Sequence, residues 1–168
     1  RRQLLALLRP DFEVEASGVD EAPFRGLPAE KLVLALSAAK ARAVSARQAA
    51  PALVIGADTV VELDGEILGK PQGPGEAQGM LERLSGRDHR VHTGVCLCRP
   101  GGEESFVCTT KVFFDPLTPE EIAWYIASGE PFDKAGGYGI QGLAGRFVSG
   151  VEGDYFNVMG LPVNQLYR

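Results

Sequence analysis

Residues 54–68 read VIGADTVVELDGEIL and carry the clearest signals for the architecture of the chain. The apolar runs Leu53–Ala57 and Thr59–Leu63 each have the length of a strand. Asp64-Gly65 follows them, and this dipeptide is typical of a two-residue hairpin turn. Glu66–Leu68 is then the returning strand, so the stretch predicts the hairpin on which a sheet is built.

Helical patterns lie on both sides of this hairpin. A helix is expected from Pro28 to about Arg47, and Lys40 falls in line with its apolar stripe. A capping box at Thr118–Glu121 opens another helix, which Gly129 closes. The other expected elements are a helix at Gln3–Leu8, a strand beginning at Phe12–Val14, a helix through Ala77–Leu84, a hairpin of Val91–Cys98 with Phe106–Phe114, two short late strands and a last helix from about Pro162. Because helices and hairpins alternate, we expect an α/β fold whose sheet is mixed rather than purely parallel.

Composition and charge limit the class of protein. With 168 residues, 45% hydrophobic and 23% charged, the chain is expected to form one compact domain, or one domain with two lobes around a cleft. The net charge of −5 disfavours nucleic-acid polymers and membrane surfaces as partners. The three cysteines are an odd number on expected strands, which favours structural thiols and a cytoplasmic protein.

Asp58 is the most informative single residue, because it interrupts an otherwise apolar strand sequence. A carboxylate at such a place is costly unless a cation or hydrogen-bond donors compensate its charge. Asp58 is therefore either a structural residue that caps a turn through Thr59 and backbone amides, or a metal ligand or general base. The pattern alone leaves both interpretations open.

Two lysines are candidate partners of an anion. Lys40 lies on the buried stripe of its helix, so it needs a negative partner, which is either Asp58 or Glu21 within the protein or a bound ligand. Lys70 follows a glycine, which lets the backbone approach an anion that the ammonium group also reaches, although a solvated loop lysine has the same sequence.

A glycine-dense segment, Gly136–Gly142, lies in the second half of the chain and matches neither a Walker loop nor a dinucleotide fingerprint. It is either a turn between strands or a loop that approaches a ligand, with Gln141 able to read the edge of a base. Asp133-Lys134, just before it, is either a surface ion pair or part of a phosphate site.

The sequence favours hydrolysis by direct attack of water, without a covalent intermediate on the protein. The sequence contains no nucleophile elbow and no zinc-protease motif. His89 and His92 are three positions apart on a strand and therefore face opposite sides, so they are not adjacent ligands. The candidate groups are carboxylates, lysines, an N-terminal arginine pair and glycine loops. This set of groups favours a metal-assisted attack of water on a phosphoanhydride.

These residues together resemble the Maf family of nucleoside triphosphate pyrophosphatases. The segments that carry the resemblance occur in family order and cover nearly the whole chain: Gly56–Val61, Asp64–Pro71, Leu84–His89 with Thr93-Gly94, Asp133–Gly142 and Val158–Pro162. The family has a Ser-x-Ser-Pro-Arg-Arg loop before its first helix, and Arg1 matches the last arginine of that loop. We therefore expect residues 1–168 to form a single Maf-like domain that lacks the rest of this loop and ends before the family's C-terminus.

The resemblance implies an elongated, twisted sheet flanked by helices, with two lobes around a cleft, in a homodimer. It implies hydrolysis of a nucleoside triphosphate between the α- and β-phosphates, with Mg²⁺ or Mn²⁺ as cofactor. Asp58 carries over as general base close to the metal, and Glu21 as a site carboxylate. As phosphate ligands the resemblance assigns Arg1, Lys40 and Lys70.

Two further positions separate branches of the family. Thr59 and Gln141 resemble the branch that acts on dTTP and UTP, and they are the expected specificity residues. The main interpretation is thus a dTTP/UTP pyrophosphatase that removes surplus or modified nucleotides. The alternatives are a pyrophosphatase of 7-methyl-GTP, and a non-catalytic nucleotide-binding regulator of septum formation.

Overall fold

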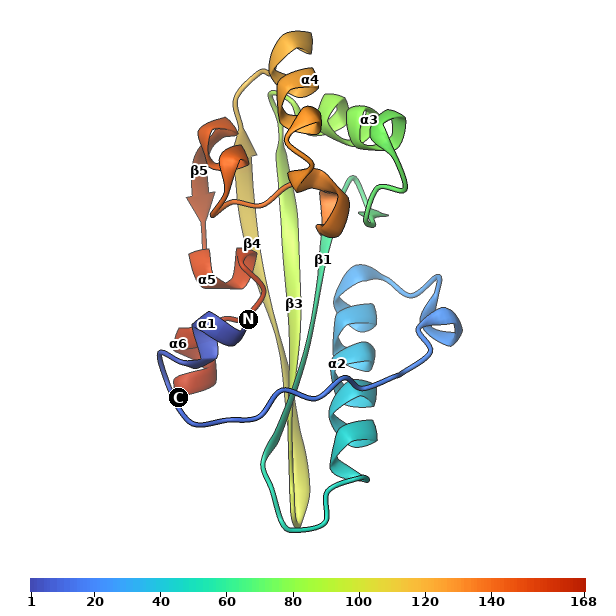
Figure 1. Ribbon diagram of the computed structural model, residues 1–168, viewed down its shortest axis with the longest axis vertical. Coiled ribbons are helices and arrows are strands. Elements are labelled where there is room, and N and C mark those ends of the chain that lie inside the picture. Colours follow the sequence, from blue (N-terminus) through green and yellow to red (C-terminus); the bar gives the residue numbers. More distant parts are fainter.

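The chain forms one open, five-stranded sheet in the order β2-β1-β3-β4-β5, described here from a computed structural model that covers residues 1–168. The strands are β1 (Val54–Leu63), β2 (Glu66–Leu68), β3 (Asp88–Arg99), β4 (Gly102–Phe114) and β5 (Val148–Glu152). Figure 1 shows β3 and β4 running along most of the long axis and twisting on the way. The expected α/β class and the elongated sheet are confirmed. All four pairings are antiparallel, however, whereas mixed pairing was expected.

The β1–β2 hairpin forms where the sequence predicts it. Asp64 and Gly65 have φ values of 54° and 81°, and a positive φ at both central residues is what a type I′ turn requires. The two apolar runs before the turn are one continuous strand, because β1 pairs with β3 from Val54 to Glu62 without a break at Asp58. The expectation of two separate strands is therefore wrong.

Helix α2 (Ala29–Ser45) packs unusually close to the sheet. A Cβ atom on Gly56 of β1 would lie 2.2 Å from the Ser37 carbonyl oxygen, and one on Gly94 of β3 would lie 2.2 Å from the carbonyl oxygen of Val33. Only glycine leaves room for this approach. The predicted helix is confirmed, and the close contact places Lys40 directly beside β1.

The other helices cover the upper and left parts of the sheet. They are α1 (Arg2–Leu5), α3 (Pro74–Leu84), α4 (Pro119–Ala127), α5 (Tyr155–Val158) and α6 (Val163–Tyr167), with the 3₁₀ segments η1 (Ala22–Phe24), η2 (Glu130–Asp133), η3 (Ala135–Gly137) and η4 (Leu143–Phe147). Figure 1 places α3 and α4 at the upper end, α2 beside the lower half, and α1 and α6 with both termini on the other side. The capping box is confirmed, since the Glu121 backbone N–H donates to the Thr118 hydroxyl and the Thr118 N–H to the Glu121 carboxylate.

The apolar core is divided between the two halves of the molecule. The larger cluster lies in the upper half and includes the buried rings of Phe114, Tyr125, Tyr138 and Phe147. A smaller cluster lies under α1 and α6, and two more lie under α2. The long strands β3 and β4 join these halves. The cysteines are unpaired, with Cys96 buried and the other two half-buried, as expected for structural thiols.

Residues 9–21 contain no helix or strand, so the strand expected to begin at Phe12–Val14 is wrong. This segment is held over α2 instead, because the guanidinium group of Arg47 donates to the carbonyl oxygens of Ala16 and Ser17 at 2.7 and 3.0 Å and to the Glu15 carboxylate at 2.8 Å. Figure 1 shows it crossing from α1 to the far side of α2. No helix is long and apolar enough to span a bilayer.

Candidate active site

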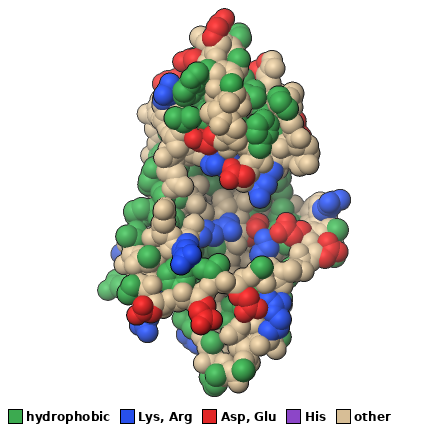
Figure 2. Space-filling view, viewed as in Figure 1, with side chains coloured by type: hydrophobic (Ala, Val, Ile, Leu, Met, Phe, Trp, Pro, Cys, Tyr) green, Lys and Arg blue, Asp and Glu red, His purple; other side chains and the backbone are tan.

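Five of the seven predicted site residues gather where β1 is a free sheet edge. Strand β2 pairs only with Val61–Leu63, so one edge of β1 around Asp58 has no neighbouring strand. Figure 2 shows a hollow about midway along the molecule, with Lys and Arg side chains inside it and Asp and Glu side chains around them. We use the name cleft for the site that Arg1, Glu21, Lys40, Asp58 and Thr59 form at this edge of β1.

Asp58 and Glu21 share the ammonium group of Lys40. The Lys40 Nζ atom lies 2.6 Å from Asp58 Oδ1 and 2.7 Å from Glu21 Oε1. Asp58 comes from β1, Lys40 from α2, and Glu21 from the segment just before η1. The Asp58 side chain is only 14% exposed, so the ion pair provides the cation that its charge needs at this place.

The electrostatic effect of this cluster is visible on Lys40. Partial burial lowers the pKa of Lys40, but the hydrogen bonds with Asp58 and Glu21 more than compensate, and the net pKa lies above its ordinary value. Lys40 is therefore a firmly charged ammonium group at neutral pH. The sequence offered Asp58 or Glu21 as the partner of Lys40, and in the structure Lys40 forms an ion pair with each of them.

Arg1 is fixed at the same edge of β1 by two hydrogen bonds. Its Nε donates to the carbonyl oxygen of Gly160 at 2.8 Å, and its Nη2 donates to the hydroxyl of Thr59 at 2.9 Å. Burial lowers the pKa of the Arg1 guanidinium, whereas the nearby carboxylates of Asp58 and Glu21 raise it. Arg1 thus lies in the field of both acidic side chains, and it stays charged because guanidinium is not deprotonated in proteins.

Gly160 and Thr93 belong to this arrangement, although residue patterns gave neither a role. A Cβ atom on Gly160 would lie 3.2 Å from Arg1 Nε and 3.3 Å from Thr59 Oγ1, and its φ of +106° is unfavourable for other residues. The Thr93 hydroxyl lies 2.9 Å from that of Thr59. The only signals in the sequence were their membership of the Thr93-Gly94 and Val158–Pro162 segments, which carried the resemblance.

Lys70 and Gln141 lie outside this set of contacts. Lys70 is exposed and makes no ion pair, but the carbonyl of the preceding Gly69 accepts a 2.9 Å hydrogen bond from the Gly136 N–H. This bond ties Lys70 to the glycine-dense segment. The Lys134 side chain and, more weakly, Lys70 lower the pKa of Asp133, which places Lys70 near the Asp133-Lys134 pair.

The loop that carries Gln141 is anchored on both sides of it. The Gly139 N–H donates to the Tyr125 hydroxyl at 3.3 Å, and the Leu143 N–H donates to the Glu130 carboxylate at 2.9 Å. The Tyr125 hydroxyl itself donates to Glu130 at 2.9 Å. Gln141 between these anchors is exposed and makes no hydrogen bond with Asp58 or its neighbours. The structure therefore brings together Arg1, Glu21, Lys40, Asp58 and Thr59, and leaves Lys70 and Gln141 on adjacent loops.

A divalent cation fits the donor set at the cleft. The structure contains no cluster of three or more His, Cys, Asp or Glu side chains of the kind that encloses a metal. Asp58 and Glu21 are two carboxylates that converge on one cationic group, Lys40. Mg²⁺ is commonly held by only one or two carboxylates together with water and substrate phosphates, so these two residues suit it.

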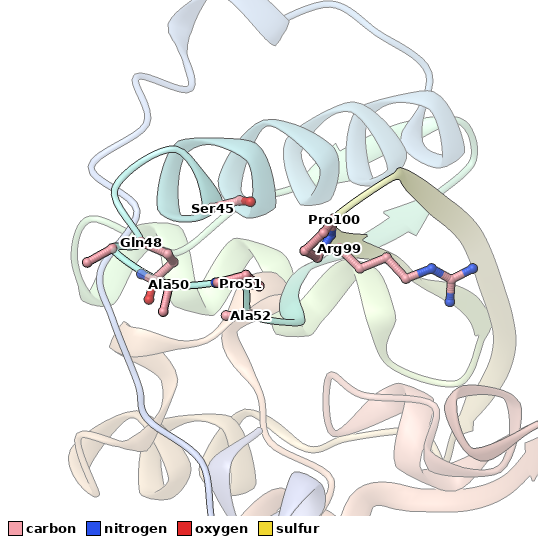
Figure 3. A pocket seen from close by; sticks show the side chains of 8 residues that line it. Ser45, Gln48, Ala50, Pro51, Ala52, Arg99 and Pro100 are labelled. Atoms are coloured by element: carbon pink, nitrogen blue, oxygen red, sulfur yellow. The ribbon is translucent and has the colours of Figure 1, made fainter.

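The histidines and the hollow at the lower tip take no part in this site. His89 lies in the upper core against the Tyr138 hydroxyl, and His92 lies on the other face against Glu62, as their spacing predicts. A hollow of about 310 Å³ at the lower tip lies between the end of α2 and the β3–β4 turn. Figure 3 shows its lining, where the charged end of Arg99 points away from the other labelled residues.

The comparisons with known proteins cover the whole chain. A family model described as "Maf-like protein" matches residues 1–168. The dTTP/UTP pyrophosphatase of Moorella thermoacetica is 51% identical over 168 residues, which are 99% of this chain and 86% of that protein. The enzyme of that name from Geobacillus is also 51% identical, covering 100% and 90% of the two chains, and that from Thermus thermophilus is 48% identical, covering 99% and 86%.

Proposed function

The chain belongs to the family of Maf-like proteins, and from this premise we propose that it is a pyrophosphatase that hydrolyses dTTP and UTP to the nucleoside monophosphate and pyrophosphate. Relatives with about half of their residues identical carry that name. One observation supports the proposed chemistry most directly. The carboxylates of Asp58 and Glu21 both form ion pairs with the Lys40 ammonium group, and Arg1 lies close to both.

The cationic side chains of the cleft bind the triphosphate. Arg1 has N–H groups beyond the two that hold it in place, and a guanidinium fork matches phosphate oxygens in geometry and charge. Lys40 adds an ammonium group from α2, and Lys70 adds one from the loop that follows β2. Because the chain as a whole is negative, these local cations are what attracts a polyanionic substrate.

Asp58 acts as the general base. A water oxygen forms a bond to the α-phosphorus, the P–O bond that bridges to the β-phosphorus breaks, and the water proton passes to the Asp58 carboxylate. The pyrophosphate group leaves with the electron pair of the broken bond. A divalent cation, Mg²⁺ or Mn²⁺, would be held by Asp58 and Glu21 and would supply charge neutralisation on the phosphates.

Gln141 and Thr59 set the preference for pyrimidines. The amide of Gln141 can donate one hydrogen bond and accept another, which matches the imide edge of thymine and uracil. A base with a different edge leaves these polar groups unpaired, and this lowers its rate. The exposed position of Gln141, between two anchored residues, supports this role.

The cysteines and the exposed apolar residues support two further parts of the proposal. Three unpaired thiols suit a reducing cytoplasm. Val151, Tyr155 and Phe156 are exposed near the edge strand β5, where a second copy would cover them in a homodimer. Sedimentation of the purified protein checks the dimer.

The decisive experiment measures pyrophosphate release from a panel of nucleoside triphosphates with Mg²⁺ and with Mn²⁺. We expect dTTP and UTP to be the best substrates, and Asp58→Asn to lower turnover by about 100-fold or more while the circular dichroism spectrum is unchanged. Equal release by the wild type and Asp58→Asn would refute the role of Asp58. Binding without release would favour a non-catalytic regulator, and a preference for 7-methyl-GTP would assign the protein to the other branch.

A further inference from the structure

Arg1 is part of a closed ring of hydrogen bonds that reaches into the core. Its Nη2 donates to Thr59, whose hydroxyl lies 2.9 Å from the hydroxyl of Thr93. Thr93 Oγ1 lies 3.0 Å from the carbonyl oxygen of Asn157, which also accepts the Gly160 N–H at 2.9 Å. The Gly160 carbonyl accepts from Arg1 Nε and closes the ring.

Only one placement of the hydroxyl protons makes every contact in the ring a hydrogen bond. The carbonyl oxygen of Asn157 cannot donate, so the single proton of Thr93 points to it. Thr93 then has no proton left for Thr59, and the Thr59 hydroxyl donates to Thr93. Thr59 therefore offers only an acceptor to Arg1 and to any ligand, and it donates to neither.

Thr93 is the residue that makes the Thr59 hydroxyl donate into the core and accept from Arg1. Its side chain is fully buried, with 0% of its surface exposed, and among the cleft residues its hydroxyl is hydrogen-bonded only to Thr59. Without its hydroxyl, the Thr59 proton loses its acceptor and can turn toward Arg1, where a hydroxyl proton faces a cation. The Thr59–Arg1 bond then weakens, and the guanidinium group is held only through Gly160.

We propose that Thr93 is a positioning residue for the hydrolysis of nucleoside triphosphates. Through the Thr59 hydroxyl it fixes the guanidinium plane of Arg1, so that the free N–H groups face the triphosphate. This inference rests on the proposed function, because it assigns Arg1 to the phosphates. It adds a buried threonine to the determinants of phosphate binding, and it assigns to Thr59 the role of an acceptor for Arg1.

The test compares Thr93→Val, which removes the hydroxyl at nearly constant volume, with Thr93→Ser, which keeps it. We expect Thr93→Val to raise the KM for dTTP by roughly 10-fold, in the range of one hydrogen bond to a charged group, with kcat changed by less than about threefold. Thr93→Ser is expected to restore the KM. An unchanged KM in Thr93→Val, or no rescue by serine, would overturn the proposal.

A double-mutant cycle separates positioning from a general structural effect. Arg1→Met removes the guanidinium group, and Thr93→Val is expected to raise the KM no further in that background. Thr110→Val is the matched control, because Thr110 is also fully buried but bonds to Asp154 and to the Asn157 side chain. Any effect of Thr110→Val is expected to be the same with and without Arg1. Additivity of Thr93→Val with Arg1→Met would refute the coupling.

Two further measurements keep the test decisive. If Thr93→Val does not fold, Thr59→Val removes the hydroxyl that accepts from Arg1 in the same ring. Thr59→Val must then raise the KM in the wild-type background and must raise it no further in the Arg1→Met background. If the wild type releases no pyrophosphate from any nucleotide, the proposed function fails by itself. Calorimetric binding of inorganic pyrophosphate then tests the ring, because Thr93→Val must weaken it about 10-fold if Thr93 positions Arg1.

Discussion

At the scale of single residues, the cleft depends on charges that are neutralised within the protein. Asp58 is mostly buried in a strand, and its carboxylate is tolerated because Lys40 is 2.6 Å away. Lys40 is in turn held by Glu21, so that each of the three side chains limits the positions of the others. A site built this way is ordered before a substrate arrives, which reduces the cost of binding.

Replacing Lys40 tests this account of stability. Lys40→Met keeps the alkyl stem but leaves Asp58 without its cation, and we expect the free energy of unfolding to fall by about 1–3 kcal/mol. Because the pKa of Lys40 is raised above 10.5, the ammonium group's contribution to the pair is present at neutral pH and is lost as the pH rises beyond that value. Urea denaturation at pH 7 measures the change, and equal midpoints would contradict it.

Gly160 permits a direct test of how Arg1 is seated. An alanine methyl group would press on Arg1 Nε and on Thr59 Oγ1 and would strain the backbone at φ +106°. We therefore expect Gly160→Ala to raise the KM for dTTP and to lower the free energy of unfolding by about 1–3 kcal/mol. Kinetics and thermal melts measure the two effects. Gly150→Ala is the control, because a Cβ there meets only the Phe113 ring at an ordinary 3.6 Å.

At the scale of the elements, local signals predicted most of the fold. The Asp64-Gly65 turn, the Thr118 capping box and the amphipathic α2 and α3 all formed because short-range chemistry determines them. The apolar runs around Asp58 joined into one strand, because pairing with β3 outweighs a single charge. The pattern at Phe12–Val14 has no neighbouring strand to pair with, and Arg47 holds the segment after it in an irregular path.

The candidate site was predictable in part: some of its residues stand out in the sequence, and others do not. Asp58 and Lys40 stood out as charges in apolar patterns, which is a signal that one sequence contains. Arg1 and Glu21 were assigned through the resemblance. Thr93 and Asn157 are ordinary polar residues in the sequence, and the hydrogen bond between them joins positions 64 apart. Such contacts are set by the tertiary fold and leave no local pattern.

The loop around Gln141 depends on Glu130 in η2. The Glu130 carboxylate accepts from Tyr125 and from the Leu143 N–H, and burial together with this carboxylate raises the pKa of Tyr125, so that its hydroxyl stays a donor. We expect Glu130→Ala to increase the amide hydrogen exchange of Gly139 and Leu143 by about 10-fold and to reduce the preference for dTTP over dCTP. Glu120→Ala, on exposed α4, is the control. Unchanged exchange in Glu130→Ala would contradict the anchoring role.

At the scale of the whole molecule, one buried histidine links stability to pH. Burial in the upper core lowers the pKa of His89 to about 4 from its ordinary 6.5. The unfolded chain takes up the proton at about pH 6.5, whereas the folded chain resists it until about pH 4. Stability is therefore complete above pH 6.5 and falls as the pH decreases through this window.

The expected loss from His89 between pH 7 and pH 4 is about 3 kcal/mol, at about 1.4 kcal/mol per pH unit. Denaturation midpoints across this range measure it. His89→Gln cannot take up the proton and still offers a polar partner to the Tyr138 hydroxyl, so its stability is expected to fall less. The same pH dependence in both proteins would show that other groups are responsible.

The hydrogen bond between Arg1 and Gly160 joins positions 159 apart in the sequence. The stretch from Arg1 to Gly160 must therefore be complete before Arg1 can be seated in the cleft. A proteolytic cut that removes the segment carrying Arg1 or the one carrying Gly160 is therefore expected to release the other residue from this contact, while the five strands of the sheet are retained.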